Sequence, residues 1–113
     1  KEIIVDRILG SGTEPKFVAW GTGAGTAAAA DTTLFTESAE ARTTGTSSKI
    51  TTTTTNDTYQ VVGAITATAG RTITNAGLFD ASTSGNLFVK TDFTGVVLAT
   101  SDSITFTFKI QYS

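Results

Sequence analysis

The stretch that decides the fold is Ser103–Ser113, which reads SITFTFKIQYS. Large apolar side chains occupy every second position: Ile104, Phe106, Phe108, Ile110 and Tyr112. Because successive side chains of a β-strand point to opposite faces, this period of two predicts a long strand with one apolar face. Burial stabilises each such side chain by about 1.5–3 kcal/mol relative to exposure, so we expect this strand at the centre of a sheet.

Working back toward the N-terminus, shorter runs of the same kind predict further strands, linked by turns rich in Gly, Asn, Asp and Ser. They are Ile3–Leu9, Phe17–Gly21, Glu37–Thr44, Lys49–Thr55, Thr58–Thr68, Thr72–Asp80, Leu87–Phe93 and Val96–Ala99. Within Thr58–Thr68 one face carries Tyr59, Val61, Gly63, Ile65 and Ala67, and we expect Ile73 and Phe79 to share a side of the next strand.

The segments between these strands carry sequence patterns that are typical of turns and loops. Asn56-Asp57 suits a two-residue hairpin turn, because both residues tolerate positive φ. Asp80–Asn86 is dense in turn-forming residues, and Thr22–Thr36 is a flexible loop in which Ala27–Ala30 can close one helical turn. About eight strands at a spacing of roughly ten residues predict an all-β fold, an antiparallel two-sheet β-sandwich. We expect one domain, residues 1–113, in which residues 1–10 form an N-terminal arm or an edge strand.

The composition excludes several classes of protein. The 113 residues include 25 threonines but only 16% charged residues, with a net charge of −2. The basic residues are scattered singly, which gives no support for nucleic-acid binding. The longest uncharged stretches, Phe17–Ala30 and Thr58–Gly70, are too short and too rich in Thr and Gly to cross a membrane. Cysteine and histidine are absent, so disulfides, thiolate metal sites and the usual general base are excluded.

Two loops resemble ligand-binding motifs only in part. Gly21–Gly25 is glycine-rich like a phosphate loop, but the pattern GxGxxG is not met and no lysine follows. Asp80–Gly85 places oxygens at alternate positions like a calcium loop, but position twelve is Thr91 and not a glutamate. We interpret the first as a connecting loop and the second as a hairpin loop, and we expect no cofactor.

No catalytic constellation stands out. Glu37 and Glu40 are three residues apart on an extended segment, so we expect them to face opposite sides as solvated charges. Ser48 and Lys49 are neighbours that would also point apart on a strand, which argues against a serine nucleophile. The threonine run Thr51–Thr55 occurs once, so we interpret it as a Thr-rich strand and not as an ice-binding array. The chain is therefore not expected to be an enzyme.

Two segments resemble a known group of proteins. Phe17–Arg42, FVAWGTGAGTAAAADTTLFTESAEAR, is similar to a recurring stretch in small structural proteins of tailed bacteriophages. Ile73–Thr91, ITNAGLFDASTSGNLFVKT, resembles the AGLFDA…GGNLF hairpin of the same proteins, with Ser84-Gly85 where Gly-Gly is common. Together the segments cover roughly half of the chain.

The resemblance implies a virion component with a jelly-roll-like sandwich. Its most direct implication is a capsid decoration, or cement, protein that binds the outside of the head shell and stabilises it. The implied partners are the major capsid protein and further copies of this chain in a homotrimer. The implied location is the capsid surface, after synthesis in the bacterial cytoplasm. Low charge suits extended contacts, because desolvating charges is costly.

The N-terminal residues are the candidate contact with the shell or with a neighbouring copy. The apolar residues there, which fit neither a helical nor a strand period, are Ile3, Ile4, Val5, Ile8 and Leu9. An ordinary edge strand is the alternative for this segment. For the whole protein, the alternative is a tail- or fibre-associated module that recognises a host-surface glycan through Trp20 or Tyr59.

Overall fold

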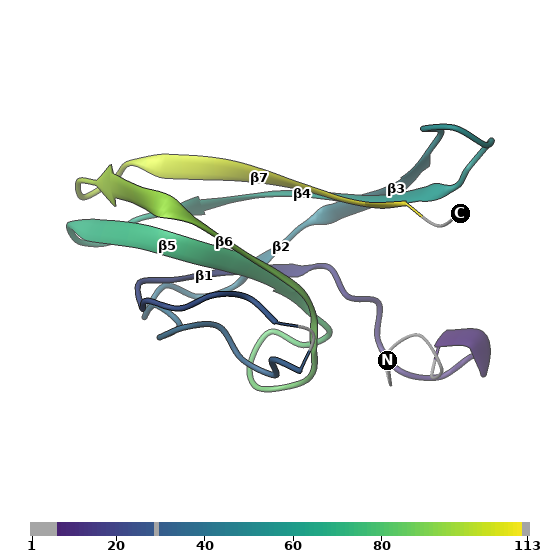
Figure 1. Cartoon of the computed structure of the whole chain (residues 1–113), viewed down its shortest axis with the longest axis horizontal. Coiled ribbons are helices and arrows are strands. Elements are labelled where there is room, and N and C mark those ends of the chain that lie inside the picture. The colour runs from purple at the N-terminus through teal and green to yellow at the C-terminus, as the bar shows by residue number, and fades with distance from the viewer. Residues whose placement is uncertain (1–6, 29, 112–113) are drawn as a thin grey trace.

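The computed structural model describes residues 7–28 and 30–111, which fold into two antiparallel sheets packed face to face (Figure 1). The first sheet has the order β2-β1-β5-β6 and the second has the order β3-β4-β7. The strands are β1 (Phe17–Gly21), β2 (Thr43–Thr44), β3 (Thr46–Ile50), β4 (Thr58–Thr66), β5 (Arg71–Phe79), β6 (Leu87–Leu98) and β7 (Ser103–Gln111). The predicted all-β sandwich is confirmed.

The described residues hold seven strands, fewer than the sequence predicted. The predicted strands Leu87–Phe93 and Val96–Ala99 form one strand, β6, because an irregularity in its pairing with β5 absorbs Thr94 and Gly95 without a turn. The predicted strand Ile3–Leu9 is wrong where it can be judged, since Arg7 and Ile8 are helical. Ile3, Ile4 and Val5 lie outside the described residues.

The main core lies between the two sheets. Val18 and Trp20 of β1 pack there against Val61 and Ile65 of β4, and all four are almost fully buried. Gly63 lies between those β4 residues, and an added Cβ would lie only 2.8 Å from the Val18 side chain. The sheets therefore approach closely at Gly63, and the predicted inward face of Thr58–Thr68 is confirmed.

A second, smaller core lies on the outer face of the first sheet. Ala19 and Phe79 are buried there under Leu34, which belongs to the long loop between β1 and β2 (Figure 1). The loop buries the outer face of β1 and of the second half of β5, residues 75–79, so these parts of the two strands are buried on both faces. Ile73 and Phe79 lie in different cores, contrary to the prediction, because the pairing irregularity between Ile73 and Asn75 interrupts the alternation.

The two sides of the sandwich differ. On one side the chain passes directly from β2 in the first sheet to β3 in the second, through the buried residue Gly45. A Cβ at Gly45 would lie 2.5 Å from the Val61 side chain, so glycine permits this close crossing. At the opposite edge, the last strand of the first sheet is β6 and the last strand of the second sheet is β7. The prediction that Ser103–Ser113 forms a central strand is wrong, because β7 pairs with β4 alone among the described strands.

Candidate functional site

Exposed apolar side chains mark two parts of the surface. Ile8 and Leu9 are 81% and 75% exposed, and Val97, near the end of β6, is 79% exposed. Water-exposed large apolar side chains are informative when they cluster, because burying them against a partner is favourable. Ile8 and Leu9 are the described residues of the predicted contact segment, and their contact with a partner stays a prediction.

A glycine-rich turn follows this pair and leads from the N-terminal segment, purple in Figure 1, toward the sandwich. The amide of Gly10 donates to the Arg7 carbonyl at 3.1 Å, and Gly10 and Gly12 both have positive φ. Such φ values suit glycine, which has no Cβ to clash with the backbone. The chain then joins the sandwich at Pro15, whose carbonyl oxygen lies 3.0 Å from the Tyr59 hydroxyl.

Neither aromatic residue considered for glycan binding presents an open ring. Trp20 is 1% exposed in the main core. Tyr59 is half-buried and packs edge-on against Phe88, with 6.4 Å between ring centroids. Burial and the nearby charge of Glu14 raise the pKa of Tyr59. Both rings are used inside the fold, and stacking on a sugar needs an exposed ring face.

As their spacing predicted, Glu37 and Glu40 do not form a carboxylate pair, because each binds a different arginine. They are, however, not both solvated charges. Glu37 forms a two-pronged ion pair with Arg42, at 2.8 and 2.9 Å. The side chain of Glu40 is only 3% exposed, and its Oε2 lies 2.7 Å from Nε of Arg71. The expectation of a solvated Glu40 is wrong, because tertiary contacts that sequence spacing does not reveal bring Arg71 and Trp20 to it.

Glu40 is the centre of a hydrogen-bond cluster that joins three parts of the chain. Its carboxylate accepts hydrogen bonds from Trp20 Nε1, the Ser38 hydroxyl, the Thr68 amide and hydroxyl, and Arg71 Nε. Burial by itself would raise the pKa of this carboxyl, but these donors outweigh it and hold the pKa well below its ordinary value of 4.5. A permanently ionised, fully bonded carboxylate is a structural element and is unsuited to proton transfer.

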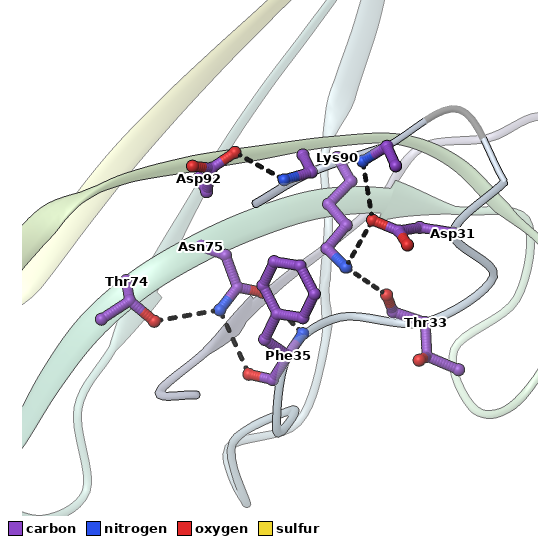
Figure 2. A network of polar contacts seen from close by, with 9 residues as sticks. Asp31, Thr33, Phe35, Thr74, Asn75, Lys90 and Asp92 are labelled. Atoms are coloured by element: carbon purple, nitrogen blue, oxygen red, sulfur yellow. Dashed lines mark hydrogen bonds and ion pairs between the residues drawn. The ribbon is translucent and has the colours of Figure 1, made fainter. Parts of the chain in front are cut away.

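The glycine-rich stretch after β1 belongs to the loop that covers the first sheet. The amides of Thr22 and Gly23 donate to the carbonyls of Thr36 and Phe35, at 3.0 and 2.8 Å. The amide of Ala27 donates to a carboxylate oxygen of Asp92 at 2.9 Å (Figure 2). These amides are used within the protein and lie beside an acidic side chain. The connecting-loop interpretation fits this arrangement.

Lys90 fixes this loop to the sheet, as Figure 2 shows. Its ammonium group lies 3.0 Å from Asp31, 2.8 Å from the Thr33 carbonyl oxygen and 3.2 Å from the centre of the Phe35 ring. The side chain is 4% exposed. Asp31 also accepts from the Ala28 amide, and this bond, followed by the contact with Lys90, lowers its pKa.

Asn75 fixes the same loop from β5. It is fully buried, and its side-chain amide both accepts from the Phe35 amide and donates to the Phe35 carbonyl, each at 3.1 Å. This pairing copies the bonding of a β-strand, so one side chain satisfies the backbone of a residue that has no strand neighbour. Thr74 donates to the carbonyl of Gly23 beside it.

The loop after β5 forms a hairpin connection. Asp80 accepts hydrogen bonds from the amide and side chain of Asn86, at 2.7 and 3.1 Å. Nη1 of Arg42 donates to the carbonyls of Ala81 and Ser84. The Asp80 carboxylate is thus bonded to Asn86, and a guanidinium charge lies against the same loop, which disfavours the calcium-loop alternative.

The threonine run is a loop and not the strand that the sequence predicted. Asp57 accepts hydrogen bonds from the backbone amides of Thr52, Thr53 and Thr54, at 2.9–3.1 Å. These bonds fold residues 51–57 into a loop that leaves the paired part of β3 and β4. These bonds, that from Thr54 most of all, hold the pKa of Asp57 well below 3.8. β3 and β4 do pair as a hairpin, but the predicted two-residue turn at Asn56-Asp57 is wrong, because the connection spans residues 51–57.

The comparisons with known proteins name no relative: no family model, no curated protein and no solved structure matches this chain. Residues 7–28 and 30–111 contain no group of three His, Cys, Asp or Glu placed to bind a metal. No helix within the same ranges is long and apolar enough to cross a membrane.

Proposed function

We propose that this protein is a bacteriophage capsid decoration protein that binds the outer surface of the head shell and stabilises it. The observation that carries the proposal is the pair Ile8 and Leu9, which is exposed in the segment expected to contact the shell. The resemblance of Phe17–Arg42 and Ile73–Thr91 to phage structural proteins supplies the identity of the partner. The major capsid protein is that partner.

The rest of the molecule is suited to a structural role. The two glutamates that were candidates for a carboxylate pair are bonded into the fold: Glu40 by Arg71, and Glu37 by Arg42. A binding protein of this kind needs a rigid body and a surface that buries area against the shell. Both requirements are met by a sandwich with a small set of exposed apolar residues.

The mechanism is thermodynamic. A protein that binds only the expanded shell stabilises that state by mass action. In a homotrimer, which the resemblance implies, three weak contacts act together through their high effective concentration. Each single contact can then be weak while the trimer as a whole binds the shell tightly.

A binding assay with shells tests the proposal. Purified protein is mixed with expanded shells that lack it, and the bound fraction is measured by co-sedimentation. The double variant Ile8→Ser and Leu9→Ser should lose at least tenfold in affinity, because two exposed apolar side chains are removed from the contact. Val97→Ser is the matched control, since Val97 is equally exposed but lies near the end of β6.

Immunogold labelling of the parent particle tests the location separately. Gold over the head supports the decoration role. Gold confined to the tail or its fibres would instead favour the tail-associated module, and absence of gold from every particle would overturn a role in the virion. Equal shell binding by the double variant and by Val97→Ser would remove Ile8 and Leu9 from the contact.

A further inference from the structure

β7 has the sequence of a central strand but the position of an edge strand. Its residues Ser103–Gln111 alternate strictly between half-buried apolar and exposed polar side chains. Along all nine residues it pairs in unbroken register with β4 on one side. No described strand pairs with its other side. Within residues 7–28 and 30–111, one row of β7 backbone amides and carbonyls therefore has no strand partner, and such a row can pair with a further strand.

The other edges of the two sheets carry features that discourage strand pairing. β2 has two residues and β3 has five, including Lys49. β6 carries Lys90 and Asp92, and its pairing with β5 is irregular at two places. Short edges, charges and bulges are the usual protections against edge-to-edge association. β7 has nine residues with no proline, no glycine, no bulge and a single charge, Lys109.

The apolar face of β7 is also incompletely covered. Ile104, Phe106, Phe108 and Ile110 pack against the main core, yet each is only partly buried. On the neighbouring strand β4, the corresponding residues Val61 and Ile65 are almost fully buried. Phe88 and Phe93 of β6, the edge strand of the other sheet, are likewise only partly buried. The core is therefore open on the side where β6 and β7 lie.

We propose that β7 pairs antiparallel with β7 of a second copy of this chain. The pairing joins two three-stranded sheets into one six-stranded sheet around a twofold axis. It goes beyond the proposed shell-binding role and does not depend on it. It is also a different contact from the one that would build a homotrimer, because pairing around a twofold axis joins two copies only. It satisfies the free backbone groups of both edges, and it places an apolar strand face beside an identical one.

The sequence of β7 is complementary to itself in one register. Full overlap of Ser103–Gln111 places Thr107 opposite Thr107 of the second copy. Phe106 then faces Phe108, and Ile104 faces Ile110. These are aromatic and aliphatic cross-strand pairs, which stabilise a sheet. The only charge, Lys109, faces Thr105, so no like charges meet directly.

The charge content of β7 favours a second copy over an acidic or basic partner strand. The outward face of β7 carries four uncharged polar residues and Lys109, so little charge is desolvated when two copies meet. The contact is a strip about 30 Å long, the length of nine extended residues, and a single strand wide. Such a contact lies at the small end of protein interfaces, so we expect a weak, concentration-dependent dimer.

Two substitutions at one position test the register. In the proposed pairing, Thr105→Lys places two lysines opposite the two Lys109 side chains, and Thr105→Glu places two glutamates there. Thr105 is exposed, so neither change disturbs the core. We expect Thr105→Lys to weaken the dimer about tenfold and Thr105→Glu to strengthen it, because like charges opposite each other are unfavourable and unlike charges are favourable. Ser48→Lys, on the exposed edge strand β3 of the same sheet, is the matched control.

Sedimentation velocity of the full chain, from micromolar to millimolar concentration, measures the association. A twofold increase in mass with rising concentration supports the proposal if two conditions hold. The midpoint concentration must move in opposite directions for the two Thr105 variants, and it must stay fixed for Ser48→Lys. A chain that stays monomeric at millimolar concentration overturns it. So does any oligomer, a trimer included, whose midpoint ignores both Thr105 variants.

A covalent test reports the register without reference to affinity. The chain has no cysteine, so Thr107→Cys introduces a single thiol. Directly opposed residues of antiparallel strands have Cα atoms about 4.5–5.5 Å apart, within the range that a disulfide spans. Mild oxidation should therefore link two Thr107→Cys chains rapidly. Equal linking of Ser48→Cys chains would overturn the pairing, because that residue lies on the opposite edge.

Discussion

Trp20 and Glu40 are joined inside the protein by a hydrogen bond from the indole Nε1–H to the carboxylate Oε1, at 3.1 Å. Trp20 contributes its ring to the main core, where it meets Phe106 of the opposite sheet edge-on, at 6.3 Å between centroids. Glu40 contributes a charge that also binds Arg71. Glu40 therefore attaches the loop before β2 to Trp20 of the first sheet, and the Trp20 ring in turn contacts Phe106 of the second sheet.

Replacing Glu40 by glutamine should destabilise the protein by about 3 kcal/mol. The change removes charge-assisted hydrogen bonds and leaves the partly buried Arg71 without its counter-ion. Urea unfolding followed by tryptophan fluorescence measures the loss. Glu37→Gln is the control, because its ion pair with Arg42 is more exposed on the carboxylate side, and it should cost clearly less. Equal losses would contradict the central role of Glu40.

Acid should destabilise the folded protein below about pH 4.5. The pKa of Glu40 is lower in the folded state than its ordinary value of 4.5, so the unfolded state binds the proton more readily. Its contribution to stability is thus complete above pH 4.5 and is lost as the pH falls toward the folded pKa. Urea midpoints at pH 7, 4 and 3 measure the loss. Glu40→Gln should have a flatter profile, and an unchanged profile would refute the assignment.

Replacing Lys90 by methionine should loosen the loop that covers the first sheet. The substitution keeps much of the apolar stem but removes the ammonium group from Asp31, Thr33 and the Phe35 ring. We expect faster hydrogen exchange of amides in residues 22–36 and a stability loss of about 1–2 kcal/mol. Lys49→Met is the control, since Lys49 is exposed on β3. Similar exchange in the two variants would show that Lys90 does not hold the loop.

Replacing Gly77 by alanine should cost more than 2 kcal/mol, by an overpacking mechanism. A Cβ at Gly77 would lie 2.6 Å from the backbone carbonyl oxygen of Val89 and 3.1 Å from Leu34, so β5, β6 and the covering loop would have to separate. Gly70→Ala is the matched control, because the nearest atom to a Cβ there is 3.9 Å away. Thermal unfolding measures both variants, and equal midpoints would contradict the close packing at Gly77.

Local pattern predicted the longer strands well, but it predicted the described part of Ile3–Leu9 and most of Lys49–Thr55 wrongly, and it predicted the neighbours of each strand poorly. The alternation in Thr58–Thr66 and Ser103–Gln111 identified two paired strands with the correct inward faces, because a period of two is a property of each strand alone. Whether a strand is central or at an edge depends on what else pairs with it. The apolar face of β7 therefore suggested a central position that the sheet order does not give.

The candidate contact site was only partly predictable. The run of apolar residues near the N-terminus drew attention to Ile8 and Leu9, and the structure leaves both exposed. The helical turn at Arg7 and Ile8 was not predicted, because apolar content without a clear period distinguishes neither helix nor strand. The open edge of β7 could not be found from sequence at all.

Strand periodicity and residue identity need no knowledge of contacts, so an all-β protein without cysteine or histidine chemistry could be predicted from the residues alone. The roles of the charged residues, in contrast, depend on the tertiary structure. Sequence spacing predicts Glu40 as a solvated charge and assigns no role to Lys90, yet each is buried among partners distant in the chain: Trp20 and Arg71 for Glu40, and Asp31 and Phe35 for Lys90. Burying a charge is favourable only where folding supplies such partners, and that depends on contacts between segments far apart in sequence.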